Sequence, residues 1–319
     1  MRRSVVLLLA VVSLASTARY AMADDTLKVA IPQRGAWDAG VAELGQRGGI
    51  FKKHGLDLDI LYTSAGPESI QAVIGGSIDI AAASGVSAAI GTFAKGAPIR
   101  ILSSEMTGAP DLYWYVPVDS PIHTVQDFNG KTVAYSLTGS SSHASLLALI
   151  AQEHLTAKPQ STGNIAATIT QTMTGQVDVG FGAAPFGLDL VEAGKTRIIA
   201  TGNDVVALRT RAVRVNITGA ATLTAKHDAL VRFMQAYRET LTTMYSDPDA
   251  ITAYAAFAGV SPAIARQVRD QYFPQAALDP DRMSGLDAIM ADGVRFKFLS
   301  APLTPAQIKQ IVVIDEVKP

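Results

Sequence analysis

The stretch VAYSLTGSSSHASLLALI, residues 133–150, gives the strongest indication of the fold. It begins with a short apolar run, turns through Gly and Ser, and continues with apolar residues at helical spacing. A turn that starts a helix leaves backbone N–H groups without partners at the positive end of the helix dipole. These residues therefore form a candidate anion-binding loop, for which an ordinary helix cap with spare serines is the alternative. The loop consists of Thr138, Gly139, Ser140, Ser141 and Ser142.

The same strand-and-helix pattern occurs in both directions from this stretch. Predicted strands alternate with predicted helices, which is typical of an α/β protein with parallel sheets. Residues 171–181 (QTMTGQVDVGF) also resemble residues 71–80 (QAVIGGSIDI), since each has a helix stopped by Gly and then apolar-Asp-apolar. This long-period repeat predicts two α/β lobes. Its two acids, Asp79 and Asp178, are interpreted as structural because they are expected within strands.

Two extended segments are expected to join the lobes, residues 112–118 leading out of the first and residues 212–218 leading back. The predicted division is therefore 24–116 with 217–319 for lobe 1, and 117–216 for lobe 2. The chain after Leu223 is expected to be helical, because N-cap residues followed by Pro recur there. We expect these helices to cover lobe 1.

Residues 1–23 are expected to be a cleavable signal peptide. Arg2 and Arg3 precede an apolar run, and Ala21-Met22-Ala23 forms a small-x-small cleavage site. The chain has no Cys, which excludes disulfides, zinc thiolate sites and lipid attachment at the cleavage point. The remaining 24 basic and 28 acidic residues give a formal charge of −4, which is unlike a nucleic-acid binder. The sequence thus predicts a monomer in the periplasm.

Catalytic and cofactor signatures are missing from the sequence. The glycine spacing at residues 91–96 matches a phosphate-binding loop, but Ala97-Pro98 replaces the required Lys-Ser/Thr pair. The sequence contains neither a Gly-x-Ser-x-Gly elbow nor a His-Glu-x-x-His helix. We therefore expect no enzyme activity, no cofactor and no metal.

Five motifs together resemble those of one family. They are IFKKHGLD (50–57), AVIGGSID (72–79), DSPI (119–122), DFNGKTVA (127–134) and GSSSH (139–143). Their order and spacing resemble the periplasmic substrate-binding proteins of ABC importers, in the nitrate, sulfonate and taurine (NMT1-like) family. The resemblance covers roughly residues 27–220. It implies a type II binding-protein fold, in which two mostly parallel α/β lobes are joined by two crossover segments around a ligand cleft.

The resemblance also implies that ligand-binding loops follow the strand ends, in agreement with the general rule for open α/β sheets. Arg34 could pair with a carboxylate or sulfonate, or be a solvated loop charge. Trp37 and Phe186 could form apolar walls, or pack within a lobe. Glu105 could hold a ligand ammonium, or cap a buried turn. The full expected set is Gln33, Arg34, Trp37, Ser64, Gly66, Ser84, Gly85, Glu105, Ala184 and Phe186, with the loop Thr138, Gly139, Ser140, Ser141 and Ser142.

The function expected from this resemblance is capture of a small organic anion, of the sulfonate or carboxylate type. Hinge bending near Val116 and Val215 would close the lobes, and an ABC permease and ATPase would receive the ligand. Three alternatives remain open: a thiamine-precursor pyrimidine, an aromatic acid, or a role as a periplasmic ligand sensor. An enzyme of the same fold that depends on a Cys-rich motif is excluded, because the chain has no Cys.

Overall fold

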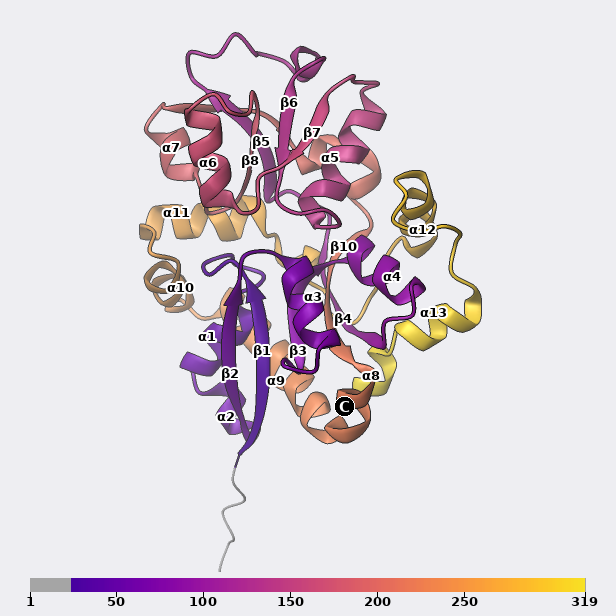
Figure 1. The fold of residues 1–319 in the computed structure, drawn as a ribbon. Helices are drawn as coiled ribbons and strands as arrows, with labels where there is room; N and C mark the ends of the chain where they lie inside the picture. The colour runs from indigo at the N-terminus through magenta and orange to yellow at the C-terminus, as the bar shows by residue number, and fades with distance from the viewer. Residues whose placement is uncertain (1–23, 319) are drawn as a thin grey trace, which may run out of the picture.

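The computed structural model describes residues 24–318, so the expected signal peptide lies outside the described residues. The chain forms two lobes, one above the other in Figure 1. Lobe 1 is built on a five-stranded sheet of order β2-β1-β3-β10-β4, in which β1 is parallel to β2 and β3 while β10 runs antiparallel to β3 and β4. Its strands are β1 (Asp25–Pro32), β2 (Leu56–Thr63), β3 (Ile80–Gly85), β4 (Ile99–Thr107) and β10 (Ala212–Gly219).

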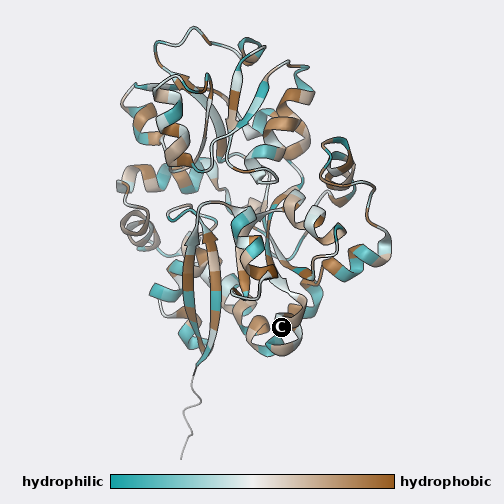
Figure 2. Ribbon diagram, in the orientation of Figure 1, coloured by the Kyte–Doolittle hydropathy of each residue, from teal (hydrophilic) through white to brown (hydrophobic). Residues whose placement is uncertain are grey.

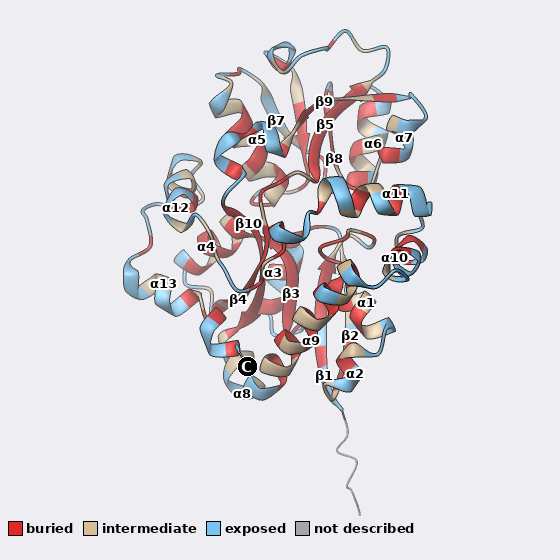
Figure 3. Cartoon of the chain, turned by 180° about the vertical axis from the view of Figure 1, so that it is seen from behind, coloured by how far each residue is buried: buried red, intermediate tan, exposed pale blue. Residues whose placement is uncertain are grey.

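Helices cover both faces of this sheet. They are α1 (Val41–Arg47), α2 (Ile50–Lys53), α3 (Gly66–Ile74) and α4 (Val86–Ala94). The central strands β3 and β10 have only buried residues, as expected for strands covered on both faces. Figures 2 and 3 show the consequence, since the apolar and buried residues concentrate in the strands and on the helix faces against them.

Lobe 2 contains a three-stranded sheet, β8-β5-β9, and a two-stranded sheet, β6-β7. Strand β5 is antiparallel to both neighbours, whereas β6 and β7 are parallel and a Val133–Val179 bridge connects β6 to the chain just before β8. The α/β class and two-lobed fold are thus confirmed, but the sheets are mixed. The elements are β5 (Leu112–Pro117), β6 (Thr132–Tyr135), α5 (Ser141–Gln152), β7 (Lys158–Ser161), α6 (Ile165–Met173), β8 (Gly180–Ala183), α7 (Leu188–Glu192) and β9 (Thr196–Thr201).

Strand pairing puts both chain crossings earlier in the sequence than expected. β5 pairs with the lobe 2 strands β8 and β9, and β10 pairs with the lobe 1 strands β3 and β4. The chain therefore crosses between β4 and β5 and again between β9 and β10, where Gly108 N–H donates to Arg211 O at 3.0 Å. Val116 and Val215 are buried within strands, so they are poorly placed to act as hinges.

The two repeat acids have equivalent structural roles. Asp79 lies just before β3, and its Oδ2 accepts a hydrogen bond from Lys28 N in β1 at 2.9 Å. Asp178 lies just before β8, and its Oδ2 accepts from Thr132 N in β6 at 2.8 Å. Each carboxylate thus ties two neighbouring strands together, which agrees with the structural interpretation, although both residues precede their strands.

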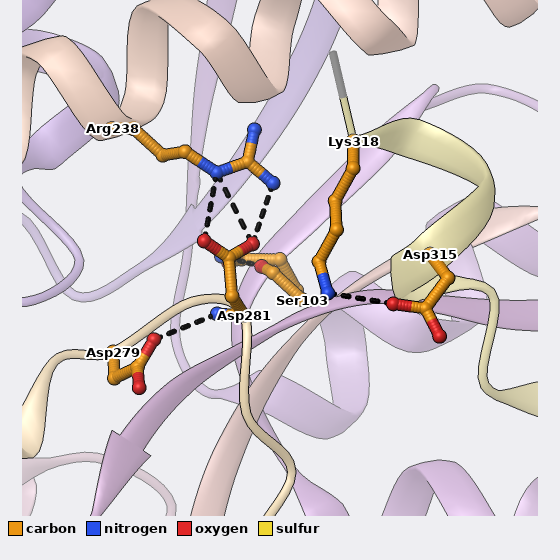
Figure 4. Close-up of polar contacts among 7 residues, drawn as sticks. Ser103, Arg238, Asp279, Asp281, Asp315 and Lys318 are labelled. Atoms are coloured by element: carbon orange, nitrogen blue, oxygen red, sulfur yellow. Dashed lines mark hydrogen bonds and ion pairs between the residues drawn. The ribbon is translucent and has the colours of Figure 1, made fainter.

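The C-terminal part of the chain is helical, as expected, and most of it packs on lobe 1. Helix α9 lies against α1 and α2. Figure 4 shows how the segment that follows α11 is attached to α9. Arg238 of α9 binds both carboxylate oxygens of Asp281, and Asp281 N donates to Asp279. The helices are α8 (Ala220–Ala225), α9 (His227–Ser246), α10 (Ala250–Ala258), α11 (Pro262–Gln267), α12 (Leu286–Arg295) and α13 (Pro305–Ile311).

Two parts of this C-terminal region also reach lobe 2, which the sequence did not predict. In Figures 1 and 3, α11 lies across the boundary between the lobes. The Phe298 ring packs edge-on against His143 of α5, with ring centroids 5.4 Å apart. Across residues 24–318, no helix is long and apolar enough to span a membrane.

Candidate ligand-binding site

Two adjoining hollows lie between the lobes. The inner cavity has a volume of about 70 Å³ and is lined by lobe 1 loops, the start of α5 and the crossing residue Asp111. The outer groove has a volume of about 700 Å³ and is lined by the loops after β1 and β2, the start of α6, the loop after β8 and the α10–α11 connection. Gln33 borders both hollows. The expected interlobe cleft therefore consists of a small inner part and a wide outer part.

The start of α5 forms one wall of the inner cavity. Ser140 is the N-cap, and its hydroxyl accepts a hydrogen bond from His143 N at 3.2 Å. The Ser142 hydroxyl is buried and lies 3.1 Å from Ser136 N and 3.0 Å from Ser140 Oγ. These two hydroxyls therefore hold the loop together. Ser141 also lines the cavity, and its hydroxyl has no hydrogen bond within residues 24–318, which makes Ser141 the best candidate donor to a ligand.

Gly139 and His143 fix the shape of this loop. Gly139 has a φ of +88°, a conformation that favours glycine. Its N–H donates to His143 Nδ1 at 3.2 Å, while the His143 ring stacks on Tyr135. Burial lowers the pKa of His143 to about 4, so Nδ1 stays an acceptor at neutral pH. Thr138, by contrast, is exposed and borders neither hollow.

Gly85 brings lobe 1 into backbone contact with this loop. A Cβ at Gly85 would lie 2.9 Å from Ser141 N, closer than real Cβ atoms approach a neighbour, and 3.0 Å from Gly139 O, which is a tight contact. A side chain at this position would therefore force the two lobes apart from the separation seen here. Gly66 borders the same cavity, and the Ser84 hydroxyl is fully buried beside it without a partner among the described residues.

A buried ionic cluster forms the floor of the inner cavity. Arg214 of β10 lies 2.8 Å from Asp38 Oδ2 through Nε and 2.7 Å from Asp111 Oδ2 through Nη2, and all three side chains are less than 10% exposed. Arg214 and Asp38 form an ion pair, although Nε and Oδ2 are not aligned for a hydrogen bond. These two carboxylates raise the pKa of Arg214 despite its burial. Its charge is therefore already compensated before any ligand binds.

Glu105 lies in β4 close to this cluster without lining the cavity. Within residues 24–318 neither of its carboxylate oxygens has a hydrogen-bond partner. The backbone amide of Ala83, a nearby donor, donates to Asn216 Oδ1 instead. Burial, reinforced by the nearby charge of Asp38, raises the pKa of Glu105 well above its usual value. Burial also raises the pKa of Asp111 to about 6, against the opposing effect of Arg214. Glu105 thus belongs to a buried acidic group and does not cap a turn.

The outer groove collects a second set of the expected residues. Arg34 is exposed, and its guanidinium lies over the rings of Tyr62 and Phe257 at 5.9 and 5.5 Å. Phe186 borders the groove, and its carbonyl accepts a hydrogen bond from Tyr113. Ser64 lies beside Gln33, whose side chain donates to Ser64 O at 3.3 Å. The groove can therefore offer an apolar wall and, at its rim, the Arg34 guanidinium, which has no acidic partner within residues 24–318.

Two expected ligand residues lie inside the protein. Trp37 is fully buried in lobe 1, where Nε1 donates to Tyr245 at 2.9 Å and the indole packs against Tyr254 at a centroid distance of 4.7 Å. Trp37 therefore packs within lobe 1, which was the alternative to a role as a wall of the cleft. Ala184 is also fully buried, and its N–H donates to Asp111 O at 3.0 Å. Its neighbours Ala183 and Pro185 border the inner cavity and the outer groove.

The sequence interpretation missed the charged floor. Asp38 lay in a loop expected to bind ligand but was not chosen, and Asp111 and Arg214 were not considered. A signal was available for Arg214, because an arginine within the apolar run of residues 212–217 needs a buried counter-ion. Nothing in the local pattern identifies that counter-ion, since Asp38 and Asp111 reach it from separate loops.

Two α/β lobes around a polar interlobe cavity define a protein with the type II periplasmic binding-protein fold. The match to a family model then gives the family. Residues 43–251 match the model described as NMT1/THI5 like. The chain therefore belongs to the NMT1/THI5-like family. No curated protein sequence matches the chain.

Several solved structures have a similar fold. The alkanesulfonate-binding protein SsuA from Xanthomonas axonopodis pv. citri, bound to MOPS, has a TM-score of 0.76 at 20% identity over 90% of this chain and 97% of that chain. The periplasmic aliphatic sulphonate-binding protein SsuA from Escherichia coli has a TM-score of 0.68 at 19% identity, covering 90% and 91%. The periplasmic nitrate-binding protein NrtA from Synechocystis PCC 6803 has a TM-score of 0.72 at 13% identity, covering 91% and 86%. At these identities the likeness demonstrates the fold alone.

Proposed function

We propose that this protein is a periplasmic solute-binding protein that captures a small organic anion between its lobes and delivers it to an ABC importer. The observation that carries the proposal is the start of α5, where the Ser141 hydroxyl and unpaired backbone N–H groups border the inner cavity. Such N–H groups and the helix dipole favour negative charge. Among the described residues lining this cavity, Arg214 is the one cationic side chain, and two aspartates already match it.

The outer groove supports an organic ligand over an inorganic anion. Phe186 and Ile165 offer an apolar wall beside the inner cavity, and nitrate would leave that wall unused. The family and the solute-binding proteins of similar fold favour a carrier over an enzyme. The expected signal peptide and the lack of Cys favour a free periplasmic protein that meets a membrane permease.

A thermal-shift screen followed by calorimetry tests the proposal, because a ligand that binds the native state raises its apparent stability. The panel would contain alkyl and aryl sulfonates, carboxylates, nitrate, pyrimidines and uncharged analogues. We expect the best ligand to be an organic sulfonate or carboxylate. A neutral compound as the best ligand, with no binding by any organic anion, would refute the assignment.

A further inference from the structure

The segment that follows α12 holds Phe298 in a fixed place on lobe 1. The Phe298 N–H donates to Gly293 O in the last turn of α12, at 2.8 Å. The Phe298 carbonyl rests on α4, since a Cβ at Gly91 would lie only 2.8 Å from Phe298 O. The next residue, Leu299, is buried and packs against Gly293. Phe298 is therefore positioned by lobe 1 contacts alone.

Helix α12 is attached in turn to the second crossing between the lobes. Arg211 of this crossing is buried, and its Nη2 lies 2.6 Å from Asp292 Oδ2 of α12. Arg211 Nη1 also donates to Ala288 O at 3.3 Å. A void of about 20 Å³ is lined jointly by α12, by this crossing and by Ser140 and Ser141 of lobe 2. The helix therefore lies close to the loop that is proposed to receive the ligand.

Phe298 meets lobe 2 at His143, the residue that shapes this loop. The two rings pack edge-on, with an interplanar angle of 84° and centroids 5.4 Å apart. The His143 ring also stacks on Tyr135 at a centroid distance of 4.1 Å, and its Nδ1 accepts the Gly139 N–H at 3.2 Å. One aromatic ring from each lobe thus holds the imidazole that fixes the turn at Gly139.

We infer that Phe298 is a positioning residue for the ligand-binding loop: closure of the lobes seats it against His143, and this contact stabilises the closed form together with the loop conformation that receives the ligand. The inference rests on the proposed function, because it assumes that the ligand binds at the start of α5 between closed lobes. When the lobes separate, Phe298 stays with lobe 1 and the contact is lost. The contact therefore favours the closed form alone, and it can change ligand affinity without changing the stability of the open protein.

The test compares Phe298→Ala with wild type and with Phe298→Tyr, which keeps the ring. Ethanesulfonate and benzenesulfonate serve as a small and a large probe, measured by calorimetry and by stopped-flow dissociation. Phe298→Ala should bind the probes about two- to tenfold more weakly, the range that one aromatic pair supplies, and should release them faster by a similar factor. Phe298→Tyr should stay within about twofold of wild type. Both Phe298 and His143 are partly exposed, so the variants should fold.

A distance measurement reports closure directly and does not require that a probe binds. The chain has no Cys, so spin labels can be placed at Leu61→Cys in lobe 1 and Met173→Cys in lobe 2, whose side chains are exposed. Pulsed electron paramagnetic resonance then gives the fraction of closed molecules, with and without ethanesulfonate. This fraction should be smaller in Phe298→Ala than in wild type and should return with Phe298→Tyr.

The outcomes separate this inference from the proposed function. Equal closed fractions in wild type and Phe298→Ala would overturn the role of Phe298, and so would unchanged affinity for a sulfonate that binds; either result leaves the anion proposal standing. A loss of stability in urea for free Phe298→Ala, with affinity unchanged, would show that Phe298 only packs within lobe 1. If neither sulfonate binds, the proposed function loses its support, and the closed fractions of the free proteins still decide the role of Phe298.

Discussion

Replacement of Gly85 by alanine should prevent complete closure of the lobes while leaving lobe 1 intact. Gly85 has a φ of −58° and a ψ of 125°, which alanine adopts without strain. The added Cβ would nevertheless lie 2.9 Å from Ser141 N and 3.0 Å from Gly139 O, both in the backbone of lobe 2. Ordinary contacts begin at 3.4 Å, so the lobes must part by roughly half an ångström.

The expected loss of ligand affinity can be estimated, because the clash occurs in the closed form alone. Overpacking by one methyl group against a rigid neighbour costs about 1–3 kcal/mol. If the open form is unaffected, this energy is lost entirely from ligand binding, which weakens affinity by roughly 5- to 150-fold. Glycine-to-alanine replacement at Gly75 is the matched control, since that residue has a φ of −72° and a nearest Cβ contact of 3.4 Å far from the cleft.

Calorimetry with the best organic anion from the screen measures this effect, and small-angle scattering reports the radius of gyration. Gly85→Ala should bind the ligand more weakly and keep a larger radius at saturation, whereas Gly75→Ala should match the wild-type protein in both. If Gly85→Ala bound the ligand as tightly as wild type, with the same radius, the argument that backbone contact at Gly85 limits closure would be wrong.

Three further predictions distinguish ligand contacts from structural ones. Ser141→Ala should weaken anion binding by roughly 0.5–3 kcal/mol with little effect on stability. Ser140→Ala should instead lower the free energy of unfolding by about 0.5–2 kcal/mol, because the helix loses its cap. The reverse pattern in calorimetry and denaturant unfolding would contradict the assigned roles. Folding raises the pKa of Glu105, so the stability that its proton contributes is complete below about pH 4.5 and is lost as pH rises. Between about pH 4.5 and 7.5 the free energy of unfolding in urea should therefore fall more for wild type than for Glu105→Gln. A difference in unfolding free energy between the two proteins that stays constant with pH would disprove the argument. Trp37→Phe breaks the hydrogen bond to Tyr245 and should lower the unfolding free energy by about 1–3 kcal/mol without changing ligand affinity, and a large loss of affinity would return Trp37 to the cleft.

Loop positions were predicted more successfully than side-chain roles. The loops after β1, β2, β3 and β6 do border the hollows between the lobes, because strand ends in an α/β lobe meet at one edge. Within those loops the sequence did not distinguish a ligand donor from a cap. Ser140 and Ser142 use their hydroxyls within the loop, while Ser141 between them does not. Neighbouring serines look alike until the helix start fixes where each hydroxyl points.

The sequence alone determined the α/β class, the repeated lobes and the helical C-terminal region, because apolar periodicity and turn residues act over short distances along the chain. It also determined that Asp79 and Asp178 are equivalent. Only the tertiary structure decided the chemistry of the cleft floor. Asp38, Asp111 and Arg214 come from a loop, a crossing and a returning strand, and a buried charge depends on which residues surround it in space, which no local pattern encodes.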